Sequence, residues 1–314
     1  MSGLHYNGPT FTLVVNPAAG RGRAERLLPR VATALLTQSP GANLRVFQTS
    51  DYAQARLRCI AAVAGARPAV AGYRRDALIV MGGDGMMNLG LNACAQTDVP
   101  LGLVPAGSGN DLVRGIGIPL RAEAAARVIS AGHTRPIDLM SARGQLVGGA
   151  ERRFVGAIVS TGFDSRVNRR ANTVPWGLGR ASYAFSALAE LAGFDSLHYR
   201  LTIDGVTREL PAMFVAVGNS GIFGGGMRGC PNAVLDDGLL DVTIVHPVSR
   251  WTLLRLLPTM FSGAFVHDPA VELLRAREVI VDGDGLYGMA DGEELGPVPL
   301  GLSAVPAALE VFVP

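Results

Sequence analysis

Short apolar runs alternate with amphipathic helical patterns from the start of the chain to about Gly132. The pattern predicts four strands, at residues 11–15, 44–48, 78–81 and 101–105. It predicts helices after the first three of these strands, at residues 24–37, 52–64 and 86–93. Strands and helices in this order connect by right-handed crossovers, so we expect an N-terminal α/β domain with a doubly wound parallel sheet.

Two of these helices also predict which side chains face the sheet. In the helix at 24–37 the apolar face comprises Leu27, Leu28, Val31, Leu35 and Leu36. In the helix at 52–64 it comprises Ala55, Leu57, Ile60, Ala61 and Val63. Pro29 either fits an early turn of the first helix or splits that helix.

The pattern changes near Asp138, where β-rich runs are separated by Asp-Gly, Gly-Gly or proline-containing turns. Strands are predicted at residues 154–160, 199–203, 208–217, 239–245 and 278–281. Asp204-Gly205, between the apolar residues 201–203 and 206–210, is a strong β-hairpin signal. Helical segments are predicted at 178–192 and 251–265. We therefore expect a C-terminal antiparallel β-sandwich domain.

The composition describes a well-buried protein and gives no reason to expect nucleic acid as a partner. Of the 314 residues, 48% are hydrophobic and 17% are charged, and the formal net charge is only +2. The length favours two domains. Three scattered cysteines without C-x-x-C spacing predict reduced thiols in a cytoplasmic protein. No secretory signal and no apolar stretch of roughly 18 residues is evident, so we expect no transmembrane segment and leave peripheral membrane association open.

The candidate chemistry is concentrated in a glycine-rich turn that follows the strand at 78–81. Gly82, Gly83, Asp84 and Gly85 leave this strand, and the next helix follows at once. N–H groups of such a loop, together with the positive end of a helix, form a site for phosphate oxygens. Asp84 would then face a metal ion, a water or a hydroxyl that loses its proton. On its own, G-G-D-G is equally typical of a tight turn.

A second glycine-rich turn, A-G-S-G-N-D at residues 106–111, follows the next strand. Turns at the ends of successive parallel strands stand side by side at the sheet edge where open α/β sheets bind ligands. The pair of turns therefore favours a phosphate loop over an isolated tight turn.

Two further clusters belong to the C-terminal half. Residues 218–238 are rich in glycine, which implies unusual backbone geometry. Residues 288–294 form an acidic turn after an apolar strand, and such a turn is ordinarily only solvated.

With these motifs assembled, the chain resembles the diacylglycerol kinase and sphingosine kinase-like lipid kinase family, in particular its soluble bacterial members. The motifs are V-V-N-P-A-A-G-R-G at 14–22, G-G-D-G-M-M-N at 82–88, P-A-G-S-G-N-D-L-V-R at 105–114, I-D at 137–138, S-T-G-F-D at 160–164, P-N-A-V-L-D-D-G-L-L-D at 231–241 and D-G-E at 291–293. Each motif alone is weak, whereas the ordered series is specific and spans nearly the whole chain.

The resemblance implies an α/β nucleotide-binding domain at 1–136, joined by the C-terminal segment 304–314, and a β-sandwich lipid-substrate domain at 137–303. It implies ATP and Mg²⁺ as cofactors. The nucleotide contacts that it implies are Asn16, Thr49, Gly82, Gly83, Asp84, Gly85, Met86, Met87, Asn88 and Ser108. For Thr49 and Ser108 the alternative role is a helix N-cap.

The resemblance also implies roles for charged residues. Arg21, Asp111, Arg114 and Asp138 could form a charged network, with an ordinary surface ion pair as the alternative. A magnesium site, structural or catalytic, is implied at the Asp237 carboxylate and the carbonyl groups of Val234 and Leu239.

Three acidic residues are implied at the active site: Glu293, Asp84 and Asp291. Glu293 is expected to act as the base or to orient the base, and Asp84 to serve the metal and the phosphates. The roles of Asp84 and Glu293 are exchangeable at this stage.

The chain departs from the family pattern at one loop position, where Met86 replaces a common threonine and removes a hydroxyl. Backbone contacts to phosphate would survive this change. No lysine stands in a Walker-like position, which argues against a P-loop NTPase.

Two apolar segments, 174–194 and 251–265, could line an acyl-chain pocket or rest on a bilayer surface. Arg169, Arg170 and Arg180 could then meet anionic head groups. Burial of both segments against a sheet is the alternative.

The function that these observations favour is an ATP- and magnesium-dependent lipid kinase, with diacylglycerol as the first acceptor to consider and phosphatidic acid as its product. An NAD kinase shares the G-G-D-G loop and a similar two-domain plan. A nucleotide- or lipid-binding regulator without catalysis is the third hypothesis. The expected partner is a lipid substrate at a membrane surface, and a homodimer is left open.

Overall fold

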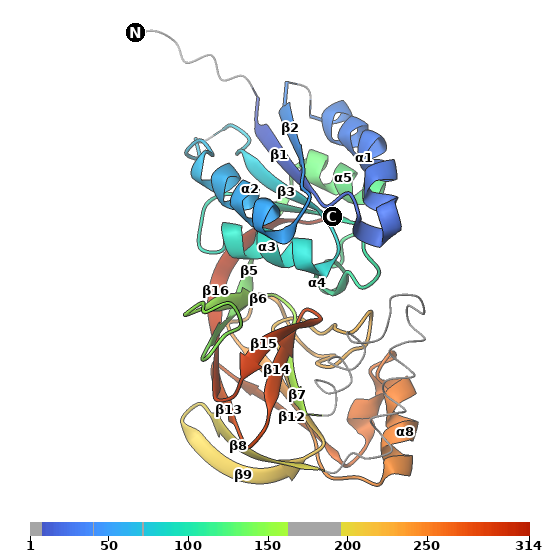
Figure 1. Cartoon of the computed structure of the whole chain (residues 1–314), viewed down its shortest axis with the longest axis vertical. Helices are drawn as coiled ribbons and strands as arrows, with labels where there is room; N and C mark the ends of the chain where they lie inside the picture. Colours follow the sequence, from blue (N-terminus) through green and yellow to red (C-terminus); the bar gives the residue numbers. More distant parts are fainter. Residues whose placement is uncertain (1–7, 40, 71, 163–195) are drawn as a thin grey trace. The chain divides into compact units, whose positions relative to one another are not determined.

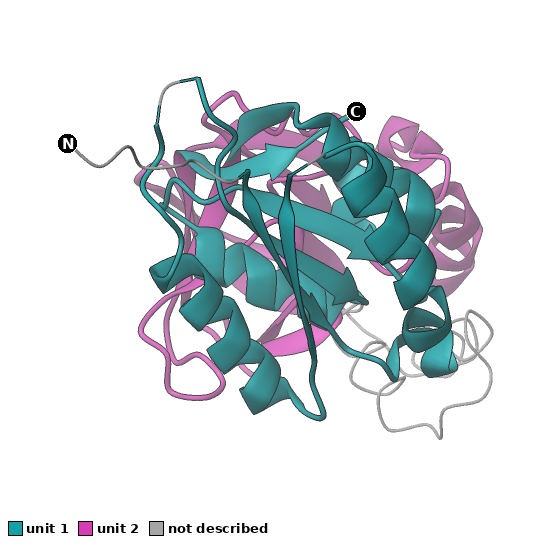
Figure 2. Ribbon diagram, turned by 90° about the horizontal axis from the view of Figure 1, so that it is seen from above, with its two compact units in different colours: residues 1–137, 307–314 teal, residues 138–306 magenta. Residues whose placement is uncertain are grey.

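The computed structural model describes residues 8–39, 41–70, 72–162 and 196–314. The chain divides into two compact units, one formed by Met1–Ile137 with Ala307–Pro314 and the other by Asp138–Pro306 (Figures 1 and 2). Three predicted features lie outside the described residues: the helix at 178–192, the whole apolar segment at 174–194, and Arg169, Arg170 and Arg180. None of the described helices is long and apolar enough to cross a membrane.

The first unit is a parallel sheet with helices on both faces, as the sequence predicts (Figure 1). Its strands are β1 (Thr10–Val15), β2 (Asn43–Gln48), β3 (Ala77–Gly82), β4 (Leu101–Pro105) and the end of β16 (Leu300–Phe312). Its helices are α1 (Ala19–Thr37), α2 (Tyr52–Ala64), α3 (Asp84–Cys94), α4 (Asp111–Ile116) and α5 (Ala122–Ala131). The strand order is β2-β1-β3-β4-β16, and each neighbouring pair is parallel.

Small residues set how closely the helices approach this sheet. A Cβ on Gly90 of α3 would lie 2.8 Å from side-chain atoms of Val80 and Leu101, so α3 packs directly on one face. On the other face, a Cβ on Gly102 would lie 2.8 Å from the side chain of Ile129 in α5. Helix α1 shares that second face, where its buried residues join the same core as Ile129.

Of the five residues in the predicted face of α2, only Ala55 is buried, so most of this prediction is wrong. Leu57 is 67% exposed and Ile60 is 46% exposed, whereas Ala55 and Cys59 are buried. Ala55 and Cys59 are four residues apart and therefore lie on one side of the helix. This narrow strip of small side chains faces the protein, and the larger apolar residues that dominate the sequence pattern face solvent.

Helix α1 becomes regular only after an irregular first turn. Gly20, Arg21 and Gly22 have left-handed backbone conformations, with φ of 60°, 59° and 77°. Pro29 lies within the regular part and does not split the helix. Val31 and Leu35 are buried as predicted, but Leu36 is 42% exposed because it lies on the solvent side.

The second unit contains two antiparallel sheets whose inner faces share one hydrophobic core. Strand β5 (Thr134–Arg143) and β16 each continue along the chain from one unit into the other. In the first sheet, β16, β13 (Glu278–Asp282), β8 (Leu197–Ile203) and β9 (Val206–Ala212) are neighbours in that order, and β5 pairs with β16 and with β6 (Arg153–Val155).

The second sheet has the order β12-β11-β10-β7-β14-β15. These strands are β7 (Ile158–Gly162), β10 (Phe214–Gly218), β11 (Leu240–Val245), β12 (Val271–Ala276), β14 (Tyr287–Ala290) and β15 (Glu293–Pro297). Helix α8 (Arg250–Thr259) and the 3-10 helix η1 (Ala264–His267) cover its outer face, where Leu253, Leu256 and Phe265 pack against Phe214 and Ile158.

The predicted hairpin is confirmed, and its turn has the expected backbone. Asp204 and Gly205 have φ of 45° and 84°, the left-handed pair that a two-residue hairpin loop requires. The runs predicted as single strands at 154–160 and 208–217 are each two strands, because the chain changes sheets between β6 and β7 and between β9 and β10. The helix predicted at 251–265 ends at Thr259, since Gly263 adopts a left-handed conformation before η1.

Candidate functional site

Three loops converge at the carboxyl ends of β1, β3 and β4 in the first unit. A Cβ added to Gly20 would overlap the carbonyl oxygen of Ala106, and one added to Gly107 would overlap the Cα of Gly83. Only glycine permits backbones to approach this closely. The two glycine-rich turns are therefore packed side by side, as predicted from the order of their strands, and the loop after β1 joins them.

The carboxylate of Asp84 ties two of these loops together. It accepts a hydrogen bond from the backbone N–H of Asn110 at 2.8 Å and another from that of Asp111 at 2.7 Å. A Cβ on Gly109 would overlap one of its oxygens, so the second turn wraps closely around the carboxylate. Burial raises the pKa of Asp84, while the two N–H groups and the charge of Arg114 oppose that rise.

The hydrogen bonds of Asp84 favour a role in positioning the loop. Both carboxylate oxygens already bind backbone N–H groups within the unit, which is the work of a residue that positions a loop. From the sequence, this carboxylate was expected to serve the metal and the phosphates. The glycines around it are the only sequence feature that relates to its hydrogen bonds with Asn110 and Asp111.

The loop after β1 has an unusual backbone. Three consecutive residues are left-handed, and Arg21 among them has a side chain that makes this conformation costly, by roughly 1–2 kcal/mol. Asn16 holds the start of the loop, since its N–H donates to the Met81 carbonyl at 3.0 Å and its side-chain oxygen accepts from the Ala18 N–H at 3.1 Å. Asn16 thus lies next to the G-G-D-G turn, where the nucleotide was expected.

Two predicted contact residues with hydroxyls differ in their availability. The Thr49 hydroxyl is buried and donates to the Val15 carbonyl at 3.1 Å, and the N-cap of α2 is Asp51. Ser108 is exposed, and its hydroxyl makes no hydrogen bond with the described part of the chain. Neither residue is a helix N-cap, because α4 begins after Asn110. Ser108 is the residue of the two that is free to contact a ligand.

Met86 covers the first glycine of the loop. A Cβ on Gly82 would lie 2.8 Å from the Met86 Cβ, and Met86 is buried. The backbone N–H groups of Met86 and Met87 donate to the Gly83 carbonyl at 3.0 and 3.1 Å. Asn88 is also buried, and its side-chain oxygen accepts from Asn92 at 3.2 Å. Met86 and Asn88 therefore shape the loop from inside the protein.

Asn110, to which no role was assigned from the sequence, is part of the same group of loops. Its φ is 57°, its side-chain nitrogen donates to the Gly107 carbonyl at 2.9 Å, and its side-chain oxygen is buried without a hydrogen-bond partner among the described residues. Asparagine tolerates the left-handed conformation better than most residues. The sequence feature that could have identified Asn110 is its position between a glycine-rich turn and the start of a helix.

In the second unit, Glu293 begins β15 directly after a tight turn. Asp291 and Gly292 form this turn, with φ of 53° and 79°, so β14 and β15 are a hairpin. A Glu293 oxygen accepts from the Arg153 guanidinium at 2.8 Å, and the Glu293 side chain is 41% exposed. Arg153, which the sequence did not single out, holds a carboxylate that is still accessible to solvent.

Strand register places several polar residues at the same end of the second sheet as this hairpin. Ala290 pairs with Val159, whose neighbour Ile158 pairs with Gly218. Gly218 pairs with Asp241, and Asp241 pairs with Arg275. The residues at this end of the sheet include Asp291, Glu293, Asn219, Asp241 and Arg275.

Asp138 fixes the loop at 231–239 from inside the second unit. Its carboxylate accepts from the Gly238 N–H at 2.7 Å, and its N–H donates to the Leu235 carbonyl at 2.7 Å. Its own carbonyl accepts from the buried Asn219 side chain at 2.7 Å. The predicted network also included Arg114, which donates to the Gly109 carbonyl at 3.0 Å within the first unit.

The carboxylate among the predicted magnesium ligands, Asp237, has no free oxygen. One Asp237 oxygen accepts from the Leu239 N–H at 3.0 Å, and the other is bound by the Arg275 guanidinium. Within the described residues, no three His, Cys, Asp or Glu side chains gather as a metal site. A metal ion therefore does not fit the predicted ligand set, because both oxygens of its one carboxylate, Asp237, are already bound by protein groups.

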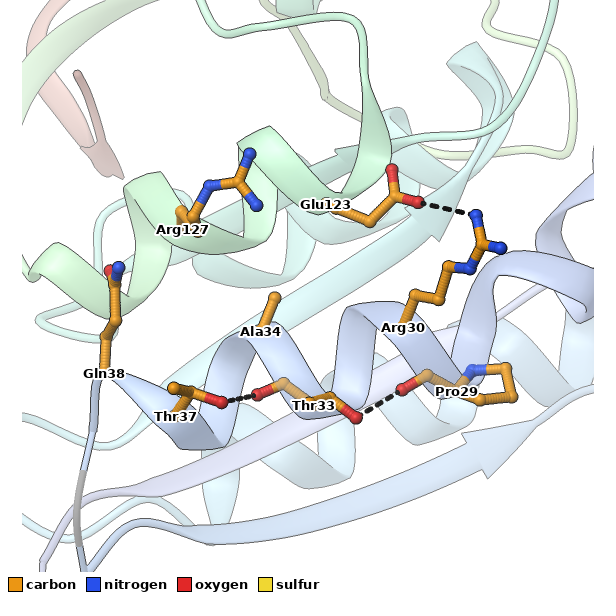
Figure 3. Close-up of a pocket in the computed structure, with 8 residues that line it drawn as sticks. All are labelled: Pro29, Arg30, Thr33, Ala34, Thr37, Gln38, Glu123 and Arg127. Atoms are coloured by element: carbon orange, nitrogen blue, oxygen red, sulfur yellow. Dashed lines mark hydrogen bonds and ion pairs between the residues drawn. The ribbon is translucent and has the colours of Figure 1, made fainter.

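A groove of about 450 Å³ lies between α1 and α5 (Figure 3). It is lined by Pro29, Arg30, Thr33, Ala34, Thr37, Gln38, Glu123 and Arg127. Arg30 and Glu123 form an ion pair at 3.7 Å at its edge. None of the predicted site residues lines this groove, so it carries no part of the candidate site.

Comparison with known proteins gives a family for each half of the chain. Residues 10–142 match the diacylglycerol kinase catalytic domain, and residues 157–313 match the YegS C-terminal NAD kinase beta sandwich-like domain. The chain is 40% identical over 305 residues to a diacylglycerol kinase of Mycobacterium tuberculosis, which covers 96% of this chain and 94% of the relative. It is 33% identical over 257 residues to the probable YegS-like lipid kinase of Pseudomonas fluorescens, covering 78% and 79%.

A crystal structure of a diacylglycerol kinase from Bacillus anthracis has the same fold. It matches with a TM-score of 0.71, 20% identity and 97% coverage of both chains. At this identity the likeness concerns the fold alone.

Proposed function

Because the chain belongs to the diacylglycerol kinase and YegS-like lipid kinase family, we propose that it transfers the γ-phosphoryl group of ATP to a lipid hydroxyl, with diacylglycerol as the preferred acceptor. The observation that carries the proposal is the convergence of three glycine loops at the carboxyl edge of a parallel sheet. Such an edge is where open α/β sheets bind nucleotides. The relative from Mycobacterium tuberculosis, at 40% identity, supports diacylglycerol as the acceptor.

The nucleotide is assigned to the loops of the first unit. The first turn of α3 contributes the N–H group of Gly85, and the loop at 106–110 contributes those of Ser108 and Gly109. These N–H groups donate to no acceptor within the described residues, and such groups suit phosphate oxygens. Ser108 adds an accessible hydroxyl, and Asn16 lies beside the G-G-D-G turn. Thr49 contributes through its position at the end of β2, since its hydroxyl is engaged. When bound with ATP, Mg²⁺ would supply positive charge that offsets the negative charge of the phosphates.

Glu293 is assigned as the base that accepts the proton of the lipid hydroxyl. The O–H bond gives its proton to the carboxylate, a new bond forms between that oxygen and the γ-phosphorus, and the bond from this phosphorus to the oxygen of the leaving ADP breaks. The Arg153 contact at 2.8 Å orients the Glu293 carboxylate and leaves it accessible. Asp291 sets the turn that presents Glu293.

Asp84 is assigned a positioning role. Its carboxylate fixes the loop at 106–110 against the start of α3, so it shapes the nucleotide site through the backbone of Asn110 and Asp111. This division of roles between Asp84 and Glu293 follows from their contacts, because the oxygens of Asp84 are already engaged and Glu293 is accessible.

A lipid acceptor implies contact with a membrane surface, and helix α8 offers suitable residues in the second unit. Trp251 is 80% exposed, Phe261 after the helix is 44% exposed, and Arg250 is also exposed. Tryptophan beside a cationic side chain suits the interface between lipid head groups and acyl chains. We assign peripheral membrane contact to this surface, defined by Arg250, Trp251 and Phe261.

The proposal is tested by transfer of labelled γ-phosphate from ATP and Mg²⁺ to mixed micelles of diacylglycerol, monoacylglycerol, ceramide or a sphingoid base. NAD serves as the soluble control acceptor. The expected product is labelled lipid, with the highest kcat/KM for diacylglycerol. Label in NAD alone would instead indicate an NAD kinase, and ATP binding without any labelled product would indicate a regulator.

A further inference from the structure

Arg275 lies between two carboxylates at one end of the second sheet. It is in β12, where it pairs in register with Asp241 of β11. Its guanidinium binds one oxygen of Asp237, and its Nε lies 3.8 Å from an oxygen of Asp241. The Arg275 side chain is 45% exposed, whereas the side chains of Asp237 and Asp241 are only 26% and 12% exposed. Arg275 thus binds the Asp237 carboxylate and lies near that of Asp241, whose Oδ2 is buried without a hydrogen-bond partner among the described residues.

The loop that contains Asp237 is closed by protein groups. The second oxygen of Asp237 accepts from the Leu239 N–H at 3.0 Å, which holds the turn of the loop itself. Asp138 binds Gly238 and Leu235, each at 2.7 Å, which anchors the loop to β5. With Arg275 on the remaining Asp237 oxygen, this carboxylate has protein partners on both sides.

We propose that the guanidinium of Arg275 occupies the cation position of the loop at 231–239. It binds the Asp237 carboxylate where a divalent metal ion would otherwise bind. A guanidinium binds a carboxylate through directional N–H groups and remains charged at all relevant pH values. A metal ion at the same oxygen would have to displace these N–H groups. The loop is therefore folded without a bound Mg²⁺.

The balance of charge supports this assignment. Asp237 and Asp241 together match one divalent ion when they are alone, whereas Arg275 already supplies one positive charge between them. Adding a divalent ion beside Arg275 would bring like charges within a few ångströms of each other, which is unfavourable. Removal of the guanidinium leaves two carboxylates and nearby carbonyl oxygens, which are the hard ligands that Mg²⁺ and Mn²⁺ prefer.

The test is Mn²⁺ binding to the nucleotide-free protein, measured by the electron paramagnetic resonance signal of free Mn²⁺. Four proteins are compared with the wild type: Arg275→Met, Arg277→Met, Asp237→Asn and the double variant Arg275→Met/Asp237→Asn. Arg277→Met is the matched control, because Arg277 is an exposed arginine two residues away. Thermal unfolding of each protein is recorded with EDTA and with Mg²⁺.

Arg275→Met is expected to gain one Mn²⁺ with an affinity at least tenfold above that of the wild type. The double variant should lose this ion, and Arg277→Met should match the wild type. The Tm of the wild type should be the same in EDTA and in Mg²⁺, whereas Mg²⁺ should raise the Tm of Arg275→Met.

Two results would overturn the proposal. In the first, the wild type binds a Mn²⁺ that Asp237→Asn loses, which would show that a metal ion occupies the loop beside Arg275. In the second, a folded Arg275→Met gains no Mn²⁺, which would show that the loop has no cation position to fill. If Arg275→Met does not fold, the comparison of wild type with Asp237→Asn decides alone, and equal Mn²⁺ binding supports the proposal.

Discussion

Replacing Asp84 with asparagine should loosen the loops that are proposed to hold ATP. The carboxylate accepts two backbone hydrogen bonds, at 2.8 and 2.7 Å, and bonds to a charged group contribute about 1.5–3 kcal/mol each. Asparagine has nearly the same shape but can accept only one of these bonds, and it turns an NH₂ group toward the other N–H. One bond is therefore lost and one repulsive contact is gained.

The net effect is smaller than this loss, because burial also penalises the carboxylate, as the raised pKa of Asp84 indicates. We expect Asp84→Asn to lower the free energy of unfolding by about 1–3 kcal/mol and to weaken ATP binding by about tenfold or more. The measurements are urea unfolding and calorimetric titration with ATP. Asp98→Asn is the control, since Asp98 is an exposed carboxylate in the same unit.

The sign of the pH dependence gives an independent check. A pKa that is raised in the folded state means that the ionised carboxylate of Asp84 is favoured less in the folded protein than in the unfolded chain. Its contribution to stability is therefore present at low pH and declines as the pH rises through the raised pKa. The advantage of the wild type over Asp84→Asn should be larger near pH 4 than at pH 7. Equal stability and equal ATP affinity for Asp84→Asn and Asp98→Asn would refute the loop-positioning role.

Two further predictions concern the thiols and the membrane surface. Cys59 and Cys230 are free and buried, and burial raises the pKa of each thiol to about 12. Iodoacetamide at pH 8 should therefore label these thiols only as fast as the protein unfolds. Rapid stoichiometric labelling of the native protein, detected by mass spectrometry, would contradict this prediction. Trp251→Ala should weaken sedimentation with vesicles containing anionic lipid by several-fold while leaving ATP binding unchanged, because the removed side chain is 80% exposed in the proposed membrane surface. Unchanged sedimentation would show that α8 does not contact the membrane.

The sequence predicts best those parts of the fold that are determined by residues close together along the chain. The strand at 78–81, its glycine turn and the following helix all appear in β3 and α3, because an apolar run, two glycines and helix-forming residues act within a few positions of each other. The hairpin at Asp204-Gly205 is predictable for the same reason, since the turn itself requires left-handed residues.

The parts that the sequence does not predict depend on distant partners. The β-rich run at 208–217 does not reveal that the chain changes sheets between β9 and β10, because Leu210 and Ala212 of β9 and Val215 and Val217 of β10 are buried in the same core. In α2, the apolar residues Leu57 and Ile60 outweigh Ala55 in any pattern, yet only small residues fit where the helix meets the protein.

The same limit applies to the candidate site. Asp84 and Glu293 can be identified from the sequence because each lies in or beside a glycine-containing turn. The sequence does not show that Asp84 binds the backbone of Asn110 and Asp111. Nor does it show that Arg275, 38 residues from Asp237, binds the carboxylate that was expected to hold a metal ion. Both partnerships depend on the packing of loops that are far apart along the chain.

The central claim is that Glu293 is the base of a lipid kinase, and single-turnover transfer of γ-phosphate to diacylglycerol by Glu293→Gln tests it most directly. The neighbouring variant Glu294→Gln is the control. General base catalysis contributes roughly 10²–10⁴ in rate, so Glu293→Gln should lose transfer by about this factor while ATP binding stays within about twofold of the wild type. A folded Glu293→Gln that transfers phosphate as fast as Glu294→Gln would contradict the account.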